Sequence, residues 1–200
     1  MASENLIPTP NFFALAPEYT DGVSGVIHDR EICRRITEGD PDAFNALYRE
    51  YAARLCAFVT RMTQDPSAAQ DIVQGMFAQL WKKPTGFRPE CGSIRSYLFG
   101  IARKETSEWW RKHGPAEPLG GGEVYSGSAE LGSLLEEAMM KLTEEHRLLL
   151  WLREIEGQSY AELAAILEIP LGTVRSRLFA AREALRDLWL SVPGTERVRS

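Results

Sequence analysis

Residues 159–179 read SYAELAAILEIPLGTVRSRLF, a stretch that predicts two helices joined by a tight turn. Ser159 and Glu162 have the spacing of a capping box, in which each side chain accepts a hydrogen bond from an otherwise unpaired amide at a helix start. Pro170 cannot continue the first helix, because it lacks an N–H group and its ring clashes with the preceding turn. We expect the second helix from about residue 171 to residue 189. The stretch therefore predicts a helix-turn-helix whose second helix fits a DNA major groove.

The second predicted helix has two distinct faces. Apolar residues recur on one side at helical spacing: Val174, Leu178, Ala181, Leu185 and Leu188. The outward side carries Arg175, Ser176, Phe179, Arg182 and Arg186. Periodicity alone is also compatible with a packed helical hairpin that binds no DNA, which is the less favoured alternative. The sequence GTVRSRL at 172–178 favours DNA binding, because small residues and arginines stand at the helix start, where base edges and phosphates are met.

This stretch resembles region 4 of extracytoplasmic-function (ECF) sigma factors, whose pattern runs roughly "sY.EIA..L.ip.GTVkSRL.rAR..L". The resemblance implies contacts to the minus-35 promoter element from Thr173, Arg175, Ser176, Arg177, Phe179 and Arg182. Arg177 lies only about 60° around the helix from Val174. We therefore expect its side chain to run along the domain edge and to meet a phosphate or a carboxylate.

Composition restricts the class of protein. The 200 residues carry a net charge of −5, which argues against a simple basic nucleic-acid binder. The charge is uneven, since residues 29–113 sum to +3 whereas residues 114–140 hold five acidic and no basic residues. Cys33, Cys56 and Cys91 are far apart and form no metal-ligand spacing with the histidines, so we expect reduced thiols, no metal and no cofactor. We see no signal peptide and no apolar run long enough to span a membrane.

The chain divides into five predicted segments. Residues 1–28 are expected to form a flexible extension, 29–113 a helical domain, 114–132 an acidic Gly/Pro/Ser linker, 133–192 the helix-turn-helix domain and 193–200 a tail. In the first domain we expect helices near 29–37, 41–63, 66–82 and 94–112, with a loop at 85–92. Sustained period-two alternation is missing, so the predicted fold is all-α, with two small helical domains joined by the linker. We also expect the acidic linker to compete with DNA for the basic surfaces.

The predicted helix 94–112 has an unusual composition. It contains five basic and two acidic residues. Phe99, Arg103, Thr106 and Trp110 share the side opposite its apolar face. Cations interleaved with aromatic rings suit single-stranded DNA, in which bases stack and phosphates meet positive charge. A solvated basic helix whose tryptophans fill gaps against a neighbour is the alternative, and from this helix alone the two interpretations are even.

Residues 42–112 resemble region 2 of ECF sigma factors. AQDIVQGMF at 69–77, followed by Leu80 and Trp81, is similar to the family's "aEDlvQEvF..lW", and SYLFGIARK at 96–104 is similar to "aWLy.IArN". The resemblance implies minus-10 contacts from Phe87, Arg88, Phe99, Arg103, Lys104 and Trp110, and polymerase contacts from Asp71, Gln74 and Phe77. This sequence departs from the family at Gly75, Tyr97, Lys104 and Glu108, and Glu168 stands in the turn where glycine is common.

The sequence is thus identified as a member of the ECF sigma factors, cytoplasmic transcription initiation factors that are not enzymes themselves. The implied partners are core RNA polymerase, through its β′ clamp and β flap, and promoter DNA; an anti-sigma factor is a further candidate partner. The alternative is a helix-turn-helix regulator that does not act as a sigma subunit. An enzyme with an appended DNA-binding domain would need a catalytic constellation in residues 29–113, and the sequence suggests none there.

Overall fold

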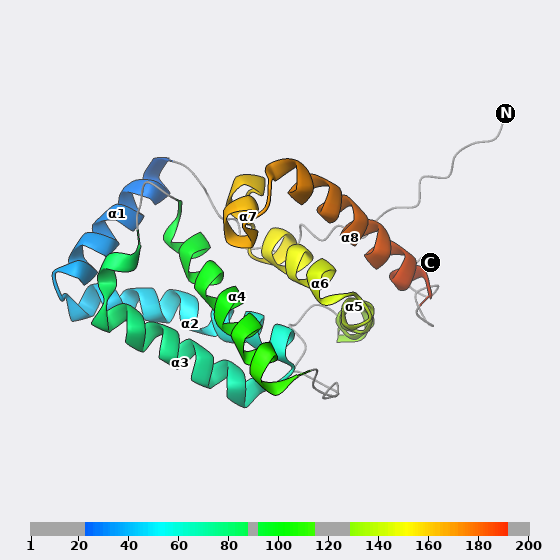
Figure 1. Ribbon diagram of the computed structural model, residues 1–200, viewed down its shortest axis with the longest axis horizontal. Helices are drawn as coiled ribbons and strands as arrows, with labels where there is room; N and C mark the ends of the chain where they lie inside the picture. The colour runs from blue at the N-terminus through cyan, green and yellow to red at the C-terminus, as the bar shows by residue number, and fades with distance from the viewer. Residues whose placement is uncertain (1–22, 88–91, 115–128, 192–200) are drawn as a thin grey trace.

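A computed structural model describes residues 23–87, 92–114 and 129–191, and every regular element in these ranges is a helix (Figure 1). The N-terminal unit comprises α1 (Val23–Thr37), α2 (Pro41–Thr63), α3 (Pro66–Lys82), the short 3-10 helix η2 (Pro84–Gly86) and α4 (Ile94–His113). The C-terminal unit comprises α5 (Ala129–Met140), α6 (Glu144–Leu150), the π-helix η4 (Trp151–Ile155), α7 (Tyr160–Leu167) and α8 (Leu171–Ser191). The predicted all-α fold is confirmed.

Side chains placed just before three helices fix where those helices begin. Asp40 accepts hydrogen bonds from the amides of Asp42 and Ala43, and Pro41 occupies the first helical position, where its missing N–H costs nothing. Asp65 caps α3 in the same manner, and Ser93 accepts a bond from the amide of Ser96 at the start of α4. The starts predicted at residues 41, 66 and 94 are therefore correct.

Two helices begin earlier than the sequence predicts. Helix α1 starts at Val23, inside the expected extension 1–28, and α5 starts at Ala129, inside the expected linker 114–132. Glycines at 22 and 25 hid the helical spacing of Val23, Val26 and Ile27, because glycine is a weak helix former. The remaining residues of the predicted extension, linker and tail, namely 1–22, 115–128 and 192–200, lie outside the described residues, as does the expected effect of the linker's acids.

The N-terminal unit is built around α2, which packs against α3 and α4. Leu47, Leu55 and Phe58 of α2 are fully buried there, as is Phe99 of α4. Helix α1 is tied to this core through Asp29, whose carboxylate accepts a 2.9 Å hydrogen bond from the backbone amide of Ile94. One carboxylate from the first helix thus satisfies an amide at the start of the fourth, where an anion is also favoured by the helix dipole.

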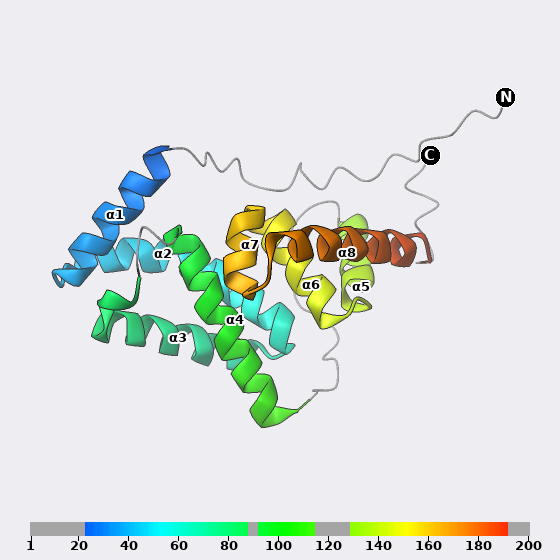
Figure 2. The same ribbon diagram turned by 45° about the horizontal axis from the view of Figure 1, so that its top comes forward.

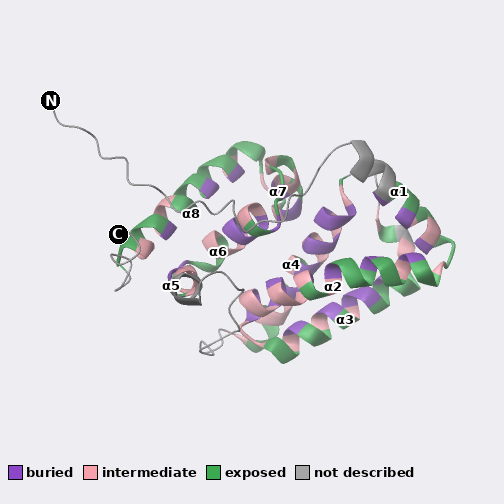
Figure 3. Ribbon diagram, turned by 180° about the vertical axis from the view of Figure 1, so that it is seen from behind, coloured by how far each residue is buried: buried purple, intermediate pink, exposed green. Residues whose placement is uncertain are grey.

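The C-terminal unit contains the predicted helix-turn-helix. The capping box of Ser159 and Glu162 is present at the start of α7, and Glu168 ends that helix with φ 57°, in the left-handed region. The four apolar residues Val174, Leu178, Ala181 and Leu185 are buried along α8. They lie on the side of α8 that faces α6 and α5, while the opposite side of the helix is exposed (Figure 3).

The two units pack directly against each other. Helix α4 lies beside α7 (Figure 2). One apolar cluster includes Ile32 of α1 and continues through Leu163, Ile166 and Leu178 of the C-terminal unit. A smaller cluster, Ala138, Leu142, Leu150, Ala181 and Leu185, joins α5 and α6 to α8. The sequence predicts two domains but not this contact between them.

Candidate nucleic-acid and polymerase interfaces

The outward face of α8 is exposed, as the sequence predicts. Arg175 and Ser176 are exposed in its first turns, Thr173 is half-buried, and Phe179 is 67% exposed, the most exposed of the large apolar side chains described. Arg175 makes no ion pair with another residue in the described part of the chain. In a major groove, the guanidinium of Arg175 and the hydroxyl of Ser176 can bond to base edges, and the exposed ring of Phe179 can contact thymine methyl groups.

Two other arginines of α8 are held by acidic residues of the same unit. Arg177 pairs with Glu145 at the start of α6, which agrees with its expected position at the domain edge beside a carboxylate. Arg182 donates two hydrogen bonds, of 3.0 and 2.6 Å, to one oxygen of Glu154. Both arginines are nevertheless about half exposed, so either could exchange its carboxylate for a phosphate.

A cleft of about 650 Å³ lies between α4 and α7 and gathers part of the predicted minus-10 group. Phe87, Arg103 and Lys104 line it, and Ile166 and Glu168 form the wall contributed by α7. The ring of Phe87 packs 5.3 Å from that of Tyr97. Arg103 points across the cleft and donates a 2.9 Å hydrogen bond to the carbonyl of Ile166. Arg88 lies outside the described residues.

Phe99 does not belong to this group, and its predicted DNA contact is wrong. Its side chain is fully buried against Phe58, with ring centroids 5.3 Å apart in an edge-to-face arrangement. The face of α4 opposite Ile94 and Leu98 is covered by α2, a packing partner that the helical period alone cannot reveal. Trp110, further along that face, is half-buried and donates its indole N–H to the carbonyl of Met62.

Of the three predicted polymerase contacts, two are exposed and one is buried. Asp71 and Gln74 are exposed on α3, whereas Phe77 is only 3% exposed. Its ring lies beneath those of Phe44 and Tyr48 of α2, so it is a core residue and its predicted surface role is wrong. The aromatic side chains that do reach the surface here are Tyr48, 40% exposed, and Trp81, 42% exposed. Both residues lie at the helical spacing of buried apolar residues, so the period alone does not indicate their exposure.

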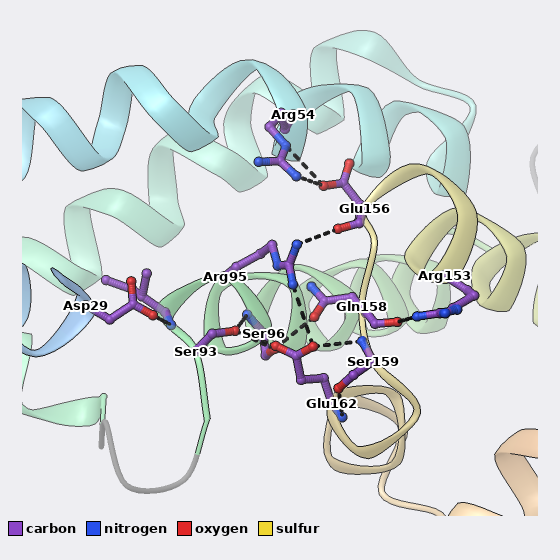
Figure 4. A network of polar contacts seen from close by, with 11 residues as sticks. Asp29, Arg54, Ser93, Arg95, Ser96, Arg153, Glu156, Gln158, Ser159 and Glu162 are labelled. Atoms are coloured by element: carbon purple, nitrogen blue, oxygen red, sulfur yellow. Dashed lines mark hydrogen bonds and ion pairs between the residues drawn. The ribbon is translucent and has the colours of Figure 1, made fainter. Parts of the chain in front are cut away.

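A buried polar network, which the sequence analysis missed, joins the two units (Figure 4). Its centre is Arg95 in the first turn of α4, whose side chain is 1% exposed. The Arg95 guanidinium donates a 2.8 Å hydrogen bond to the carbonyl of Glu156 and lies 3.6 Å from a carboxylate oxygen of Glu162. A basic residue in the first turn of a helix opposes the helix dipole. That unfavourable placement is the one signal in the sequence that Arg95 needs an acidic partner from elsewhere.

Glu162 serves both its own helix and the contact between the units. One of its oxygens accepts the 2.7 Å capping bond from the amide of Ser159, and the other accepts 2.6 Å bonds from the hydroxyls of Ser93 and Ser96. Burial raises the pKa of this carboxyl, but the three hydrogen bonds and Arg95 outweigh it, so the pKa lies below the usual range. Glu162 is therefore ionised at neutral pH and holds the start of α4 against the start of α7.

Two more ion pairs extend the contact along α2. Glu156 is almost fully buried and accepts 3.1 and 2.6 Å hydrogen bonds from Arg54, while the indole N–H of Trp151 donates to its other oxygen at 3.3 Å. Burial raises the pKa of Glu156, and Arg54 acts in the opposite direction. About two turns further along α2, Arg61 lies over the ring of Trp151 and pairs with Glu136 of α5.

Searches against known proteins agree with the two-unit organisation. Residues 47–115 match the model of Sigma-70 region 2, and residues 133–185 match that of Sigma-70 region 4. The ECF RNA polymerase sigma-E factor of Escherichia coli (strain K12) is 30% identical over 183 residues, which cover 82% of this chain and 95% of that protein. The chain belongs to the ECF sigma factors. It is thus a promoter-recognising RNA polymerase sigma factor, and a helix-turn-helix regulator of another kind is not favoured.

Other relatives support the membership of the ECF sigma factors. The RNA polymerase sigma-H factor of Pseudomonas aeruginosa is 28% identical over 177 residues, covering 78% of this chain and 91% of that protein. Among solved structures, the sigma factor RpoE in complex with the anti-sigma factor NepR from Bartonella quintana matches with a TM-score of 0.65 and 26% identity. That match covers 74% of this sigma factor and 97% of RpoE. CnrH in complex with the cytosolic domain of CnrY has the same fold, with a TM-score of 0.62 and 24% identity over 80% of this chain and 96% of CnrH.

No helix in the described ranges of this ECF sigma factor combines the length and apolarity needed to cross a membrane. In the same ranges, histidine, cysteine and acidic side chains form no group of three or more that could hold a metal ion.

Proposed function

We propose that α8 is the helix that reads the minus-35 element, with Arg175, Ser176 and Phe179 at base edges. The observation that carries this assignment is their joint exposure on one side of a helix whose other side is buried. Thr173 supports the helix start, and Arg177 and Arg182 exchange Glu145 and Glu154 for DNA phosphates. Phosphate contacts fix register while base contacts supply specificity, so the two sets should behave differently in binding assays.

The cleft beside α4 is proposed as the minus-10 site. Phe87 would stack on an unpaired base, and Arg103, Lys104 and Arg88 would meet its phosphates. Trp110 would contribute only its exposed edge, because its indole N–H is already bonded to the carbonyl of Met62.

The exposed side of α3 is proposed as the contact with the β′ clamp of core RNA polymerase, through Asp71 and Gln74 and the neighbouring ring of Trp81. The C-terminal unit would meet the β flap. The polymerase would carry the chemistry, so the sigma factor is not an enzyme and acts in the cytoplasm without a cofactor. An anti-sigma factor is a candidate partner, since RpoE from Bartonella quintana was solved in complex with one.

The test of this function is reconstitution with core polymerase. Adding the sigma factor should give specific transcripts from promoters recovered by genome-wide mapping. Asp71→Arg with Gln74→Ala should weaken binding to core polymerase in a pull-down while leaving the circular dichroism spectrum unchanged. Glu50→Arg with Gln79→Ala, at two other exposed positions, is the matched control. Undiminished binding of the first pair would overturn the clamp assignment.

A further inference from the structure

The arginines that the N-terminal unit presents to the C-terminal unit share a chemical feature. Arg54 and Arg61 of α2 and Arg95 and Arg103 of α4 each bond to an oxygen of the C-terminal unit. The oxygens come from the carboxylates of Glu156, Glu136 and Glu162 and from the carbonyls of residues 156 and 166. Guanidinium groups paired with oxygens in this manner match the geometry of Arg–phosphate recognition.

The four arginines form one continuous strip. Arg54 and Arg61 are seven residues apart and therefore share a face of α2. Arg54 and Arg95 both bond to Glu156, which places them side by side on neighbouring helices (Figure 4). Arg103 follows Arg95 by two turns of α4 and lines the cleft proposed for the minus-10 element. The strip thus leads from that cleft onto α2.

The two units cannot stay in contact while the protein works. Elements centred about 10 and 35 base pairs upstream of the start lie roughly 85 Å apart along B-DNA, at about 3.4 Å per base pair. In this conformation Ser96 of α4 lies 2.6 Å from Glu162 of α7. The 15 residues 114–128 between the units can reach at most roughly 50 Å when extended, so the units can part. When the units part, Arg54, Arg61 and Arg95 lose their carboxylate partners, and Arg103 loses its bond to the carbonyl of Ile166.

From this we infer that Arg54, Arg61 and Arg95 form, with Arg103, a binding strip for the phosphodiester backbone of unwound promoter DNA. In the free protein Glu136, Glu156 and Glu162 occupy the phosphate positions. DNA and the C-terminal unit then compete for one surface, and the arginines exchange one set of oxygens for another when the units separate. The inference rests on the proposed function and adds α2 to the DNA-binding surface.

The first test measures the strip in the assembled polymerase. Arg54→Ala and Arg61→Ala are made singly and together, because both side chains are partly exposed and tolerate truncation better than Arg95. The holoenzyme is bound to a fluorescent single-stranded oligonucleotide that carries the non-template minus-10 sequence, at a series of salt concentrations. The slope of log K against log salt should fall by about 0.7 for each arginine removed. Arg49→Ala is the control, since this exposed arginine lies about 140° around α2 from Arg54 and should leave the slope unchanged.

The second test changes the glutamates that occupy the strip in the free protein and leaves the arginines unchanged. Glu156→Gln with Glu162→Gln should let the free protein bind the same oligonucleotide about tenfold more tightly, the gain expected when the competent fraction rises from about a tenth to nearly all molecules. Unchanged salt slopes in both arginine variants, or unchanged affinity in the glutamate variant, would overturn the strip. Failure of the unmodified holoenzyme to bind promoter DNA would instead overturn the proposed function, so the two failures are distinguishable.

Discussion

The two helices proposed to bind DNA, α4 and α8, differ in how much of their surface is exposed to solvent. Helix α8 leaves Arg175 and Phe179 exposed to solvent, while the first two turns of α4 bury Arg95 and Ser96 beneath the C-terminal unit. Both helices carry arginines and aromatic rings at helical spacing, so composition does not separate them. Two helix faces can therefore look equally polar in sequence although one of them is buried. The residues that bury the face of α4 lie more than 60 positions further along the chain.

A pair of phenylalanines gives the largest contrast between the two helices. Phe99→Ala should lower the free energy of unfolding by about 3–5 kcal/mol, since it empties a core position. Phe179→Ala should change it by less than about 0.5 kcal/mol, as expected for an exposed site. Urea denaturation followed by circular dichroism measures both. Equal destabilisation by the two variants would mean that Phe179 packs against something in solution.

Removing Arg95 should disrupt the contact between the units while leaving each unit folded. Arg95→Ala leaves Glu162 and the carbonyl of Glu156 without their buried cation, at a cost of about 3 kcal/mol. We expect the radius of gyration in small-angle X-ray scattering to increase, and unfolding to lose its single transition. Lys104→Ala, an exposed cation on the same helix, should do neither. A compact Arg95 variant would show that the apolar contacts alone hold the units together.

Arg175 should matter for DNA and not for the fold. Arg175→Ala is expected to weaken binding of the holoenzyme to its preferred minus-35 sequence by about 1–3 kcal/mol and to relax specificity there. Arg182→Ala should weaken binding to all sequences alike and lower the salt slope by about one contact. Competition between matched and scrambled minus-35 DNA distinguishes the two. Equal losses of the Arg175 variant on both DNAs would make that residue a phosphate contact.

The smallest expected change in stability comes from substitutions at the C-terminal ends of α7 and α2, one helix in each unit. Glu168 ends α7 with φ 57° and Gln64 ends α2 with φ 60°, both in the left-handed region that favours glycine. Glu168→Gly and Gln64→Gly should each stabilise the protein by up to about 1 kcal/mol, visible as a higher melting temperature. Gly100→Ala in the interior of α4, where glycine has no such reason, should also stabilise, because alanine is the better helix former. A lower melting temperature for Glu168→Gly would mean that its side chain matters more than its backbone strain.

Local signals in the sequence predicted most of the helices. Asp-Pro pairs at 40–41 and 65–66 and the capping box at 159–162 each place unpaired amides beside an oxygen acceptor, and all three starts are confirmed. The periodicity of α8 also separated its buried and exposed faces correctly.

Contacts between distant segments were beyond the reach of these local patterns. The family resemblance assigned Phe77 to the polymerase contact, and Phe99 was expected to meet DNA from the side of its helix opposite the apolar face, yet neighbouring helices cover both side chains. The network around Arg95 depends on Glu156 and Glu162, which follow it by more than 60 residues, and pattern rules based on nearby spacing do not reach that far. A covered site is therefore harder to predict than a helix.

The hydrogen bond from the amide of Ile94 to Asp29 has a consequence for the order of folding. The bond joins residues 65 positions apart, so its loop closes only after most of the N-terminal unit has left the ribosome. Until residue 94 emerges, Asp29 lacks this partner and α1 lacks its tie to α4. The C-terminal unit is still unsynthesised at that moment. The arginines of α2 and α4 are therefore solvated first and bond to oxygens of the C-terminal unit last. Synthesis would thus produce the separated arrangement before the packed one.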